Sequence, residues 1–321
     1  DRDSLALHYS RQNSKINNIN DVKIYGSIGY DQVIDTDFDL IISNIPAKVG
    51  ESALAYILGE AQYYLKPGGR VAGVAITAIA EYVDKVISNL KVNVTFRKKW
   101  PGYTVFHYRF SQDVAKPDKL NVGSFQRGIY DREDMTVMAN GHKIIIKTVY
   151  GLPEFNNLSY ETEMILESLK ICRDRSLNHV LMFNPNQGII PVSLTQFAKI
   201  NKITLTDRDL LALEVSKRNL ISNGFSENNI SIRHDIDIKG ITGDRTDCII
   251  GIFDEKDSPE VNAQFLNQAF LQLGQDGLII LAGGSTPITR IEEIINANKH
   301  LKILERRRSR GKSIITLKRQ N

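Results

Sequence analysis

Two pairs of aspartates occupy matching places in the sequence, and their position suits the recognition of a ribose. Asp207 and Asp209 open the segment DRDLLALEVSKRN, and the chain begins with DRDSLALHYSRQN, which puts Asp1 and Asp3 at the same points. An apolar run precedes the second segment and helically spaced apolar residues follow it, so Asp207 is expected at the carboxyl end of a strand. Open α/β sheets bind ligands at that edge, where an acid accepts hydrogen bonds from ribose hydroxyls. The alternative is that Asp207 or Asp209 only caps the helix.

The two segments indicate that the chain holds two copies of one unit, because a shift of 206 positions superposes them. Basic residues cluster at corresponding places, between the last two expected strands of each copy. Phosphate contacts supply most nonspecific nucleic-acid affinity, so such clusters beside aromatic residues suit folded or single-stranded RNA. The alternative is a solvated strand edge that charges protect from aggregation. The clusters are Arg97, Lys98, Lys99, Trp100 and Tyr103, and Arg306, Arg307, Arg308, Arg310 and Lys312.

The composition fits two domains with buried cores. The chain has 321 residues, of which 42% are hydrophobic and 24% charged. Neither the two cysteines, Cys172 and Cys248, nor the six histidines show metal-ligand spacing, so we expect no metal and a reducing compartment, the cytoplasm. No apolar run has the length of a membrane span and no secretory signal is visible, so no membrane partner is expected. The sequence leaves the oligomeric state open.

Helices and strands alternate in the first part of the chain as in the second half of a doubly wound sheet. Apolar runs such as FDLIIS are typical of strands buried on both faces. We expect helices up to residue 13 and over 51–65 and 78–90, and strands over 21–25, 38–43, 70–76, 91–97 and 103–110. The strand over 21–25 would have no neighbour to pair with, which is very unfavourable. We therefore expect the natural protein to continue upstream by roughly fifty residues, in line with a strand-helix-strand unit.

The second part of the chain contains the pattern of a whole doubly wound domain. Residues 111–120 are polar and read as a linker, and Asn140-Gly141 predicts a hairpin over 135–149. We therefore divide the chain into a first domain, 1–112, a linker with a hairpin, 113–150, and a second domain, 151–321. The expected strands are 179–183, 203–206, 230–233, 247–253, 277–282, 301–305 and 313–317, with helices at 161–172, 263–273 and 288–298.

Three stretches give the chain a resemblance to a known family. FDLIISNIP (38–46), YLKPGGR (64–70) and the hairpin before Gly151-Leu152-Pro153 resemble the "methyltransferase small" family of class I S-adenosylmethionine-dependent methyltransferases. Its ribosomal RNA guanine methyltransferases carry two tandem copies of a Rossmann-like sheet. The resemblance covers nearly the whole chain and implies an α/β fold of two such sheets, the first incomplete at its N-terminus in this sequence.

The resemblance also implies the residues of a catalytic site. In the family, an Asn-Pro-Pro-aromatic motif accepts hydrogen bonds from an exocyclic amine while the aromatic ring stacks on a flipped-out base. Asn44 and Pro46 match this motif, but Ile45 replaces the first proline and Ala47 the aromatic residue. The backbone acceptor survives and the stacking platform does not. Alternatively, Asn44 and Pro46 only end a strand.

By the same resemblance, Asp1 is the ribose acid of the first copy, Gly26 and Ser27 lie near the adenine, and Asn44 borders the cofactor. In the second copy, the family's glycine-rich loop reads MFNPNQG, of which only Gly188 persists. Asp207 and Asp235 keep the ribose and adenine positions, but the fourth strand ends GIFD without the motif. The second copy therefore reads as a silent domain with a degenerate cofactor site.

Together these features predict an S-adenosylmethionine-dependent methyltransferase acting on an exocyclic base amine of RNA, guanine in ribosomal RNA. The second copy is expected to be a scaffold that helps to hold RNA. The alternative is a noncatalytic protein, in which Ile45 and Ala47 mark a lost active site and both domains bind only RNA or a protein partner.

Overall fold

The computed structural model describes residues 1–112, 121–239, 245–253, 259–297 and 300–320. Its internal contacts define two compact units, one formed by residues 1–26 with 132–321 and the other by residues 27–131. Residues 1–26 thus belong to the larger unit, and the division expected from the sequence, with boundaries after residues 112 and 150, stays a prediction. Most of the predicted linker falls outside the described residues.

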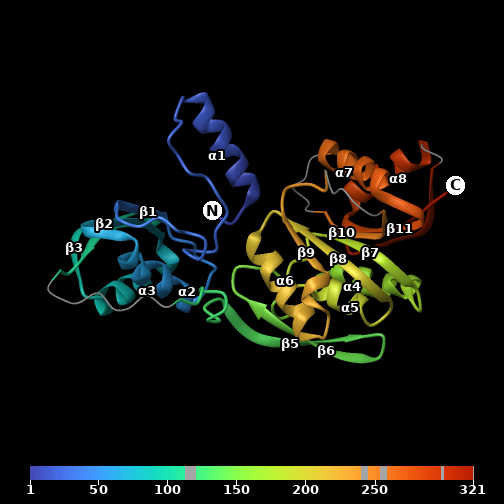
Figure 1. Cartoon of the computed structure of the whole chain (residues 1–321), viewed down its shortest axis with the longest axis horizontal. Helices are drawn as coiled ribbons and strands as arrows, with labels where there is room; N and C mark the ends of the chain where they lie inside the picture. Colours follow the sequence, from blue (N-terminus) through green and yellow to red (C-terminus); the bar gives the residue numbers. More distant parts are fainter. Residues whose placement is uncertain (113–120, 240–244, 254–258, 298–299, 321) are drawn as a thin grey trace. The chain divides into compact units, whose positions relative to one another are not determined.

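A seven-stranded sheet forms the centre of the larger unit (Figure 1). The strand order is β12-β13-β11-β10-β7-β8-β9, and neighbouring strands run parallel except at β13, which is antiparallel to β11 and β12. The order reverses between β7 and β10, which makes this point the switch of a doubly wound sheet. The strands are β7 (Ser176–Phe183), β8 (Lys199–Asp207), β9 (Ile230–His234), β10 (Thr246–Ile252), β11 (Leu273–Gly284), β12 (Leu301–Ser309) and β13 (Lys312–Arg319).

Helices cover both faces of this sheet. On β10, Cys248 and Ile250 face one core layer and Ile249 faces the other, because consecutive strand residues point to opposite faces. The run DCIIGIF is apolar throughout for this reason. Helices α4 (Tyr160–Ser168), α5 (Ile189–Leu194) and α6 (Leu210–Ser222) line the first layer, and α7 (Pro259–Gln272) and α8 (Ser285–Ala297) line the second. The doubly wound fold expected for this part of the chain is confirmed.

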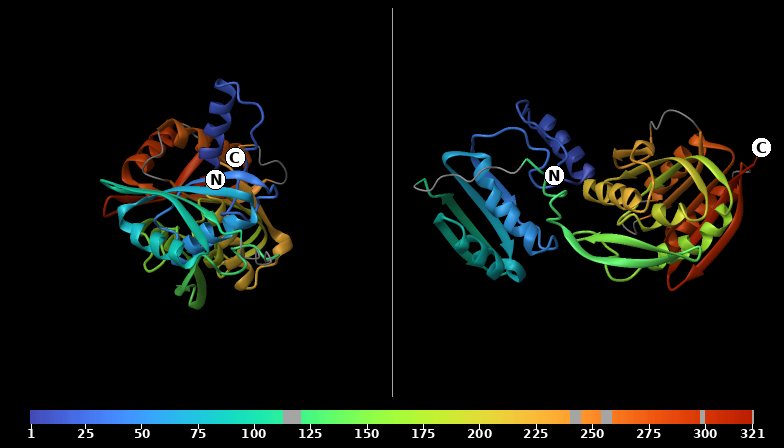
Figure 2. Two further views of the ribbon diagram at one scale, coloured as in Figure 1. Left: turned by 90° about the vertical axis from the view of Figure 1, so that its left-hand side faces the viewer. Right: turned by 60° about the horizontal axis from the view of Figure 1, so that its bottom comes forward.

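The hairpin predicted around Asn140-Gly141 is present. Strands β5 (Asp131–Ala139) and β6 (His142–Val149) form a two-stranded ribbon, seen in the right panel of Figure 2. Asn140 and Gly141 have φ angles of 50° and 81°, the left-handed values that a two-residue turn of this type requires. Apolar residues of the hairpin, such as Ile144 and Ile146, join the core layer beneath α6.

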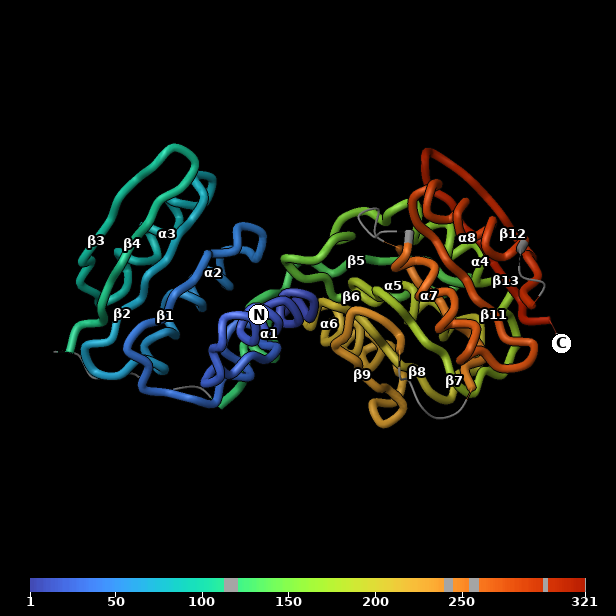
Figure 3. The backbone as a smooth tube through the Cα atoms, turned by 90° about the horizontal axis from the view of Figure 1, so that it is seen from above, coloured from blue at the N-terminus to red at the C-terminus, as the bar shows by residue number. Residues whose placement is uncertain are grey.

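The smaller unit carries a four-stranded sheet of order β1-β2-β4-β3, in which β1 and β2 are parallel and the other pairs antiparallel. Helices α2 (Glu51–Gly59) and α3 (Thr77–Asn89) lie on the same side of it (Figure 3). The other side is open among the described residues of this unit, where Ile42 is 76% exposed. The strands are β1 (Phe38–Asn44), β2 (Leu65–Ile76), β3 (Val92–Trp100) and β4 (Tyr103–Phe110).

Register shows that this sheet repeats half of the larger one. The pair β1·β2 and the pair β10·β11 both contain a register shift at the second strand residue, and the pairs β3·β4 and β12·β13 both contain one in their middle. Each of these irregularities falls at an equivalent position, which supports a true internal duplication. The matched partners are Phe38↔Leu65 and Leu40↔Arg70 with Thr246↔Leu273 and Cys248↔Leu278, and Phe96↔His107 with Glu305↔Thr316.

Three expectations about the first copy were wrong in detail. Residues 21–25 form no strand, because the described structure offers their backbone no neighbouring strand to pair with. The helix expected over 51–65 ends at Gly59, and a 3₁₀ turn follows over Glu60–Tyr63. Strand β2 then begins at Leu65 and runs through Pro67 and two glycines, because a register shift against β1 accommodates them.

Candidate functional site

The two Asp-Arg-Asp segments adopt the same local structure. Asp3 caps helix α1 (Ser4–Ile16) by accepting the Leu5 N–H at 2.9 Å, and Asp209 caps α6 by accepting the Leu211 N–H at 3.0 Å. Two residues earlier, Asp1 Oδ1 accepts the Asp3 N–H at 2.9 Å and Asp207 Oδ1 accepts the Asp209 N–H at 2.8 Å. The second aspartate of each segment is therefore the helix cap, and the first is left for another role.

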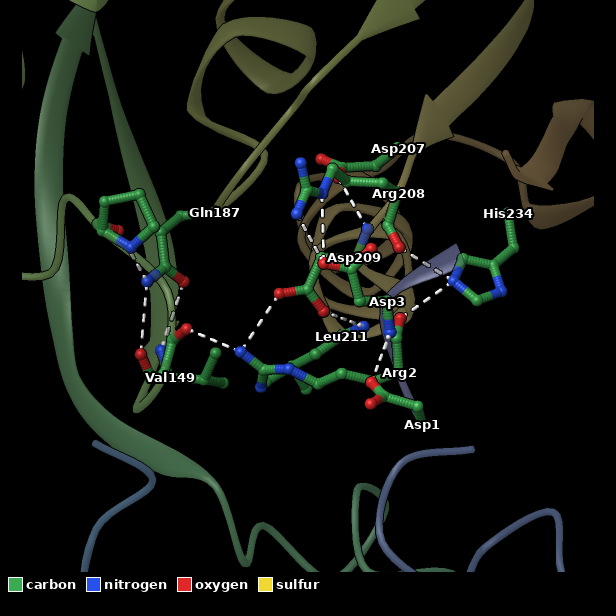
Figure 4. A network of polar contacts seen from close by, with 12 residues as sticks. Asp1, Arg2, Asp3, Val149, Gln187, Asp207, Arg208, Asp209, Leu211 and His234 are labelled. Carbon is green, nitrogen blue, oxygen red and sulfur yellow. Dashed lines mark hydrogen bonds and ion pairs between the residues drawn. The ribbon is translucent and has the colours of Figure 1, made fainter. Parts of the chain in front are cut away.

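The two segments also contact each other reciprocally (Figure 4). Asp3 and Asp209 form an antiparallel bridge. The Ser4 N–H donates to the Arg208 carbonyl at 2.8 Å, and the Leu210 N–H donates to the Arg2 carbonyl at 2.9 Å. Each arginine pairs with the other segment's cap, Arg2 with Asp209 at 3.1 Å and Arg208 with Asp3 at 2.6 Å. The equivalent residues of the two copies thus exchange the same interactions.

His234, at the end of β9, fixes this contact from one side. Its Nε2 lies 2.8 Å from the Arg2 carbonyl oxygen and 2.9 Å from that of Arg208 (Figure 4). Because both partners are acceptors, Nε2 carries the proton and donates to both. Gly26 packs against the same ring, where a Cβ would come within 2.9 Å of it.

A cavity of about 560 Å³ opens at the carboxyl edge of the seven-stranded sheet. Asn184 follows β7, Asp207 ends β8, Ile236 follows β9 and Ile252 ends β10, so the cavity lies at the switch point where such sheets bind ligands. Its other lining residues are Leu5, Pro153, Glu154, Ser159, Glu161, Phe183, Asn186, Arg208, Phe253, Val261 and Lys312.

Asp207 is the more deeply buried of two buried acids that line this cavity, with 5% of its surface exposed against 9% for Glu161. Removal from water raises the pKa of its carboxyl to about 7, although the hydrogen bond from the Asp209 N–H favours the ionised form. Burial also raises the pKa of Asp209, against the attraction of Arg2. An acid in this place, with one oxygen used by the turn, can accept hydrogen bonds from a diol through the other.

The loop that replaces the family's glycines keeps a left-handed backbone. Asn184, Asn186 and Gly188 have φ angles of 54°, 51° and 80°, and asparagine tolerates this region better than most residues. The Asn184 side chain donates to the Ile252 carbonyl at 2.8 Å, so it bridges the ends of β7 and β10. Asn184 and Asn186 both line the cavity.

The other two residues of the predicted degenerate site do not line the cavity. Gly188 lies where helices α5 and α6 approach, since a Cβ there would be 2.8 Å from the Ser216 Cα. Asp235 pairs with Arg233 at 3.1 Å and accepts the Ile236 N–H at 2.8 Å. Of the three residues, only Asp207 faces this space, and a ligand role for any of them stays a prediction.

Asn44 ends strand β1 with an exposed side chain, and a role in substrate binding stays a prediction. Ile45 behind it is 2% exposed, and its N–H donates to the Val74 carbonyl at 2.8 Å, which anchors the turn. Pro46 is exposed. In the second copy, Ile252 stands in the place of Asn44, because Asn44 pairs with Val74 as Ile252 pairs with Ala282.

The remaining residues proposed for the first cofactor site are divided between the units. Asp1 and Gly26 belong to the larger unit and Ser27 to the smaller one. Ser27 is 8% exposed, and its hydroxyl donates to the Gly29 carbonyl at 2.9 Å. A common site formed by Asp1, Gly26, Ser27 and Asn44 stays a prediction.

Most basic residues of the two clusters lie within strands β3 and β12, and not between the last two strands as expected, whereas Arg310 lies between β12 and β13 and Lys312 begins β13. Arg97 donates to Asp84 of α3 at 2.8 Å, and Arg306 donates to Glu292 of α8 at 2.9 Å. These two ion pairs are equivalent in the two copies and tie the strand to the preceding helix. Arg307 is engaged as well, with Glu167 and Glu305.

Other members of the clusters remain exposed. Lys98 lies 4.2 Å over the ring of Trp100, which stacks on Tyr103, and both rings are 42% exposed. In the second copy, Lys99 finds its counterpart in Arg308, which is exposed, and Arg310 lies over the exposed Tyr160 ring at 4.7 Å. Lys312 is paired with Glu161. RNA binding by these residues stays a prediction.

Sequence reasoning missed His234, Asn184 as a bridge, and the Glu161–Lys312 pair at the cavity. No local pattern marks them, because each depends on a partner far along the chain. The acids that hold Arg97 and Arg306 carry a signal that could have been used, since Asp84 and Glu292 stand at equivalent places of the repeat.

The seven-stranded order, the single antiparallel strand next to the edge and the acid at the end of the second strand define a class I methyltransferase fold. Residues 1–107 match the family model described as methyltransferase small domain. The first 107 residues are therefore similar to the methyltransferase small domain, and the chain has the fold of class I S-adenosylmethionine-dependent methyltransferases.

The chain resembles solved structures, and the first one named here shows the same fold. The T. thermophilus 16S rRNA N2 G1207 methyltransferase (RsmC), solved with AdoMet and guanosine, has a TM-score of 0.63 and 16% identity over 89% of this chain and 74% of that chain. A ribosomal protein L11 methylase from Lactobacillus delbrueckii subsp. bulgaricus has a TM-score of 0.43 and 15% identity over 50% of this chain and 79% of its own. No helix in the described part of the chain is long and apolar enough to span a membrane.

Proposed function

We propose that this protein transfers a methyl group from S-adenosylmethionine to an exocyclic amine of RNA, and specifically to guanine in ribosomal RNA. The observation that carries the proposal is Asn44, an exposed amide at the carboxyl end of β1 on a turn that the buried Ile45 anchors. The solved 16S rRNA N2 guanine methyltransferase of similar fold supports the choice of base. We expect the protein to act in the cytoplasm.

The chemistry assigned to this turn is positioning. The Asn44 side-chain oxygen and the following backbone carbonyl would accept the two N–H groups of the amine, which aims its lone pair toward the methyl group. Pro46 restricts the backbone just after the acceptors, because its ring fixes φ. Ala47 supplies no ring, so a base would have to stack on another part of the site.

The first copy's own residues would hold the cofactor. Asp1 has the same turn as Asp207, with Oδ1 engaged by the N–H two residues on, which leaves the other oxygen for a ribose hydroxyl. In the second copy, Asp207 has this turn and borders a cavity, so the same turn at Asp1 is compatible with a bound cofactor. Ser27 and Gly26 would lie near the adenine. The cofactor supplies the methyl group when it is bound.

RNA would be held by exposed cations beside aromatic rings. Lys98 with Trp100 in the first copy, and Arg308 and Arg310 in the second, combine phosphate contact with a surface for base stacking. The second copy would be a silent scaffold, because Ile252 takes the place of Asn44 there.

The test is methyl transfer to unmodified ribosomal RNA by the full protein and by Asn44→Ala. We expect the variant to lose at least about a hundredfold in rate, since two acceptors fix the amine, while RNA affinity is unchanged. Asn93→Ala, at an exposed asparagine of β3, is the matched control and should keep full activity. Equal rates for all three proteins would refute the role of Asn44.

A noncatalytic protein is the second candidate, because Ile45 and Ala47 depart from the catalytic motif. Calorimetric titration with S-adenosylmethionine separates the two. Saturable binding of S-adenosylmethionine together with methyl transfer supports the enzyme. RNA binding without cofactor binding or methyl transfer supports the noncatalytic alternative. A methyltransferase for proteins or small molecules would show no salt-dependent affinity for RNA.

A further inference from the structure

We propose that the cavity of the second copy is a separate binding site for a purine nucleoside, with Asp207 as the acceptor for its ribose hydroxyls. The site goes beyond the proposed transfer reaction, which takes place in the first copy. It needs no methyl group, and its ligand is a nucleoside that carries neither a phosphate nor an amino acid at its 5′ end.

The cavity has the size and the polarity for such a ligand. Its volume of about 560 Å³ lies within the usual range for small-molecule sites. Asp207 is the most deeply buried acid of its lining, with 5% of its surface exposed, and its position at the end of β8 is where sheets of this type bind a ribose.

One end of the cavity suits a flat base. Ile236, Phe253 and Val261 line it, and the same three residues border an adjoining recess of about 80 Å³. Phe183, Asp237, Gln264 and Phe265 complete the lining of this recess, and the rings of Phe183 and Phe265 have their centres 4.8 Å apart. A purine ring between aliphatic side chains and aromatic edges buries apolar surface on both of its faces.

The charges argue against a phosphate. Two cations line the cavity, and both have carboxylate partners: Arg208 with Asp3 at 2.6 Å and Lys312 with Glu161 at 2.7 Å. Glu154 and Asp207 add further acid. A phosphate would have to break one of these pairs, whereas a neutral nucleoside would not.

The Asn184 bridge argues against an amino-acid extension. Its side chain spans from the end of β7 to the Ile252 carbonyl of β10 at 2.8 Å. A glycine with the same left-handed backbone would leave that space open. S-Adenosylmethionine would therefore meet a side chain that adenosine avoids.

Isothermal titration of the full protein with adenosine tests the proposal. We expect saturable binding that weakens at least about tenfold with 2′,3′-dideoxyadenosine and in Asp207→Asn, since each loses a hydrogen bond to a charged group. AMP should also bind at least about tenfold more weakly, because its phosphate would have to break an ion pair that lines the cavity. Asp276→Asn changes an exposed acid of the same unit, paired with Lys318 and outside the cavity, and should bind normally. Val261→Trp, which fills the base end and leaves Asp207 intact, should abolish binding.

Asn184→Gly provides a gain-of-function arm. This variant should bind S-adenosylmethionine more tightly and adenosine as before, because only the amino-acid part of S-adenosylmethionine needs the space that the Asn184 side chain occupies. Absence of adenosine binding, or binding that survives both Asp207→Asn and Val261→Trp in folded protein, overturns the proposal. Loss of methyl transfer through Asn44→Ala would leave adenosine binding unchanged, so the two proposals fail separately.

Discussion

Arg97 of β3 donates to Asp84 of α3 at 2.8 Å, and the equivalent residues of the second copy, Arg306 and Glu292, form the same pair at 2.9 Å. The first pair joins β3 to the preceding helix α3, and the second joins β12 to the preceding helix α8. The first pair is partly exposed, at 44% and 36% of the two side chains. These arginines are therefore part of the fold of each copy, although the sequence places them in clusters that suit RNA.

Arg97→Gln should separate the two roles. Because the pair is exposed, we expect a loss of only about 0.5–1 kcal/mol in the free energy of unfolding, with RNA affinity nearly unchanged. Lys98→Gln should have the opposite profile, with weaker RNA binding and a shallower salt dependence but unchanged stability. Urea unfolding and filter binding at several salt concentrations measure both. A large loss of RNA affinity in Arg97→Gln would show that Arg97 contacts RNA.

The reciprocal contact between the two Asp-Arg-Asp segments predicts a distinction between cap and ion pair. Asp209→Ala loses the bond from the Leu211 N–H and the pair with Arg2, so it should destabilise the protein by about 1–2 kcal/mol. Asp209→Ser keeps the cap and loses the pair, and should recover most of this loss. Thermal unfolding of both variants gives the comparison. Equal losses would show that the Arg2 pair, and not the cap, carries the stability.

Asp207 predicts a dependence of stability on pH. Its pKa is about 7 in the folded protein, against 3.8 for the free group. Between these values the folded state holds a proton that the unfolded state has lost, so stability falls as the pH rises from about 4 to about 7 and then levels off. The charged groups that face this carboxyl are Asp209, which raises its pKa, and Arg208, which lowers it.

Asp207→Asn removes this titration while the amide oxygen can still accept the Asp209 N–H. The variant should therefore be more stable than the natural chain at pH 8, by up to roughly 4 kcal/mol, and about equal to it near pH 4. Unfolding by urea at a series of pH values measures the difference. A gap that stays constant over this range would show that Asp207 is not the group that titrates.

The fold could largely be predicted from the sequence, because the patterns that specify it lie within short segments or recur in both copies. Continuous apolar runs separated by helical patterns predicted the strands of the second sheet, and Asn140-Gly141 predicted the hairpin. The strand expected over 21–25 failed for a nonlocal reason. Its residues have the right composition, but a strand forms only where a neighbour accepts its backbone hydrogen bonds.

The sites were less predictable, for the same reason. Asp207 could be placed at the end of a strand from its neighbours alone. The Asn184 bridge depends on Ile252, which is far along the chain, and the roles of Arg97 and Arg306 depend on acids one helix earlier. A cluster of arginine and lysine residues has the same sequence pattern whether its side chains contact an RNA phosphate or a carboxylate of the protein itself.

Gly188 offers a last test of how the second copy is packed. Gly188 and Gly141 have nearly equal φ angles, 80° and 81°, so alanine carries about 1–2 kcal/mol of backbone strain at either place. A Cβ at Gly188 would also lie 2.8 Å from the Ser216 Cα, whereas one at Gly141 meets nothing within 4 Å. Gly188→Ala should therefore lose clearly more stability than Gly141→Ala, because α5 and α6 must move apart. Urea unfolding of the two variants measures the difference, and since α5 follows the Asn184 loop, adenosine binding should weaken only in Gly188→Ala. Equal losses would mean that the two helices have room for a side chain, and that this glycine is needed only for its backbone conformation.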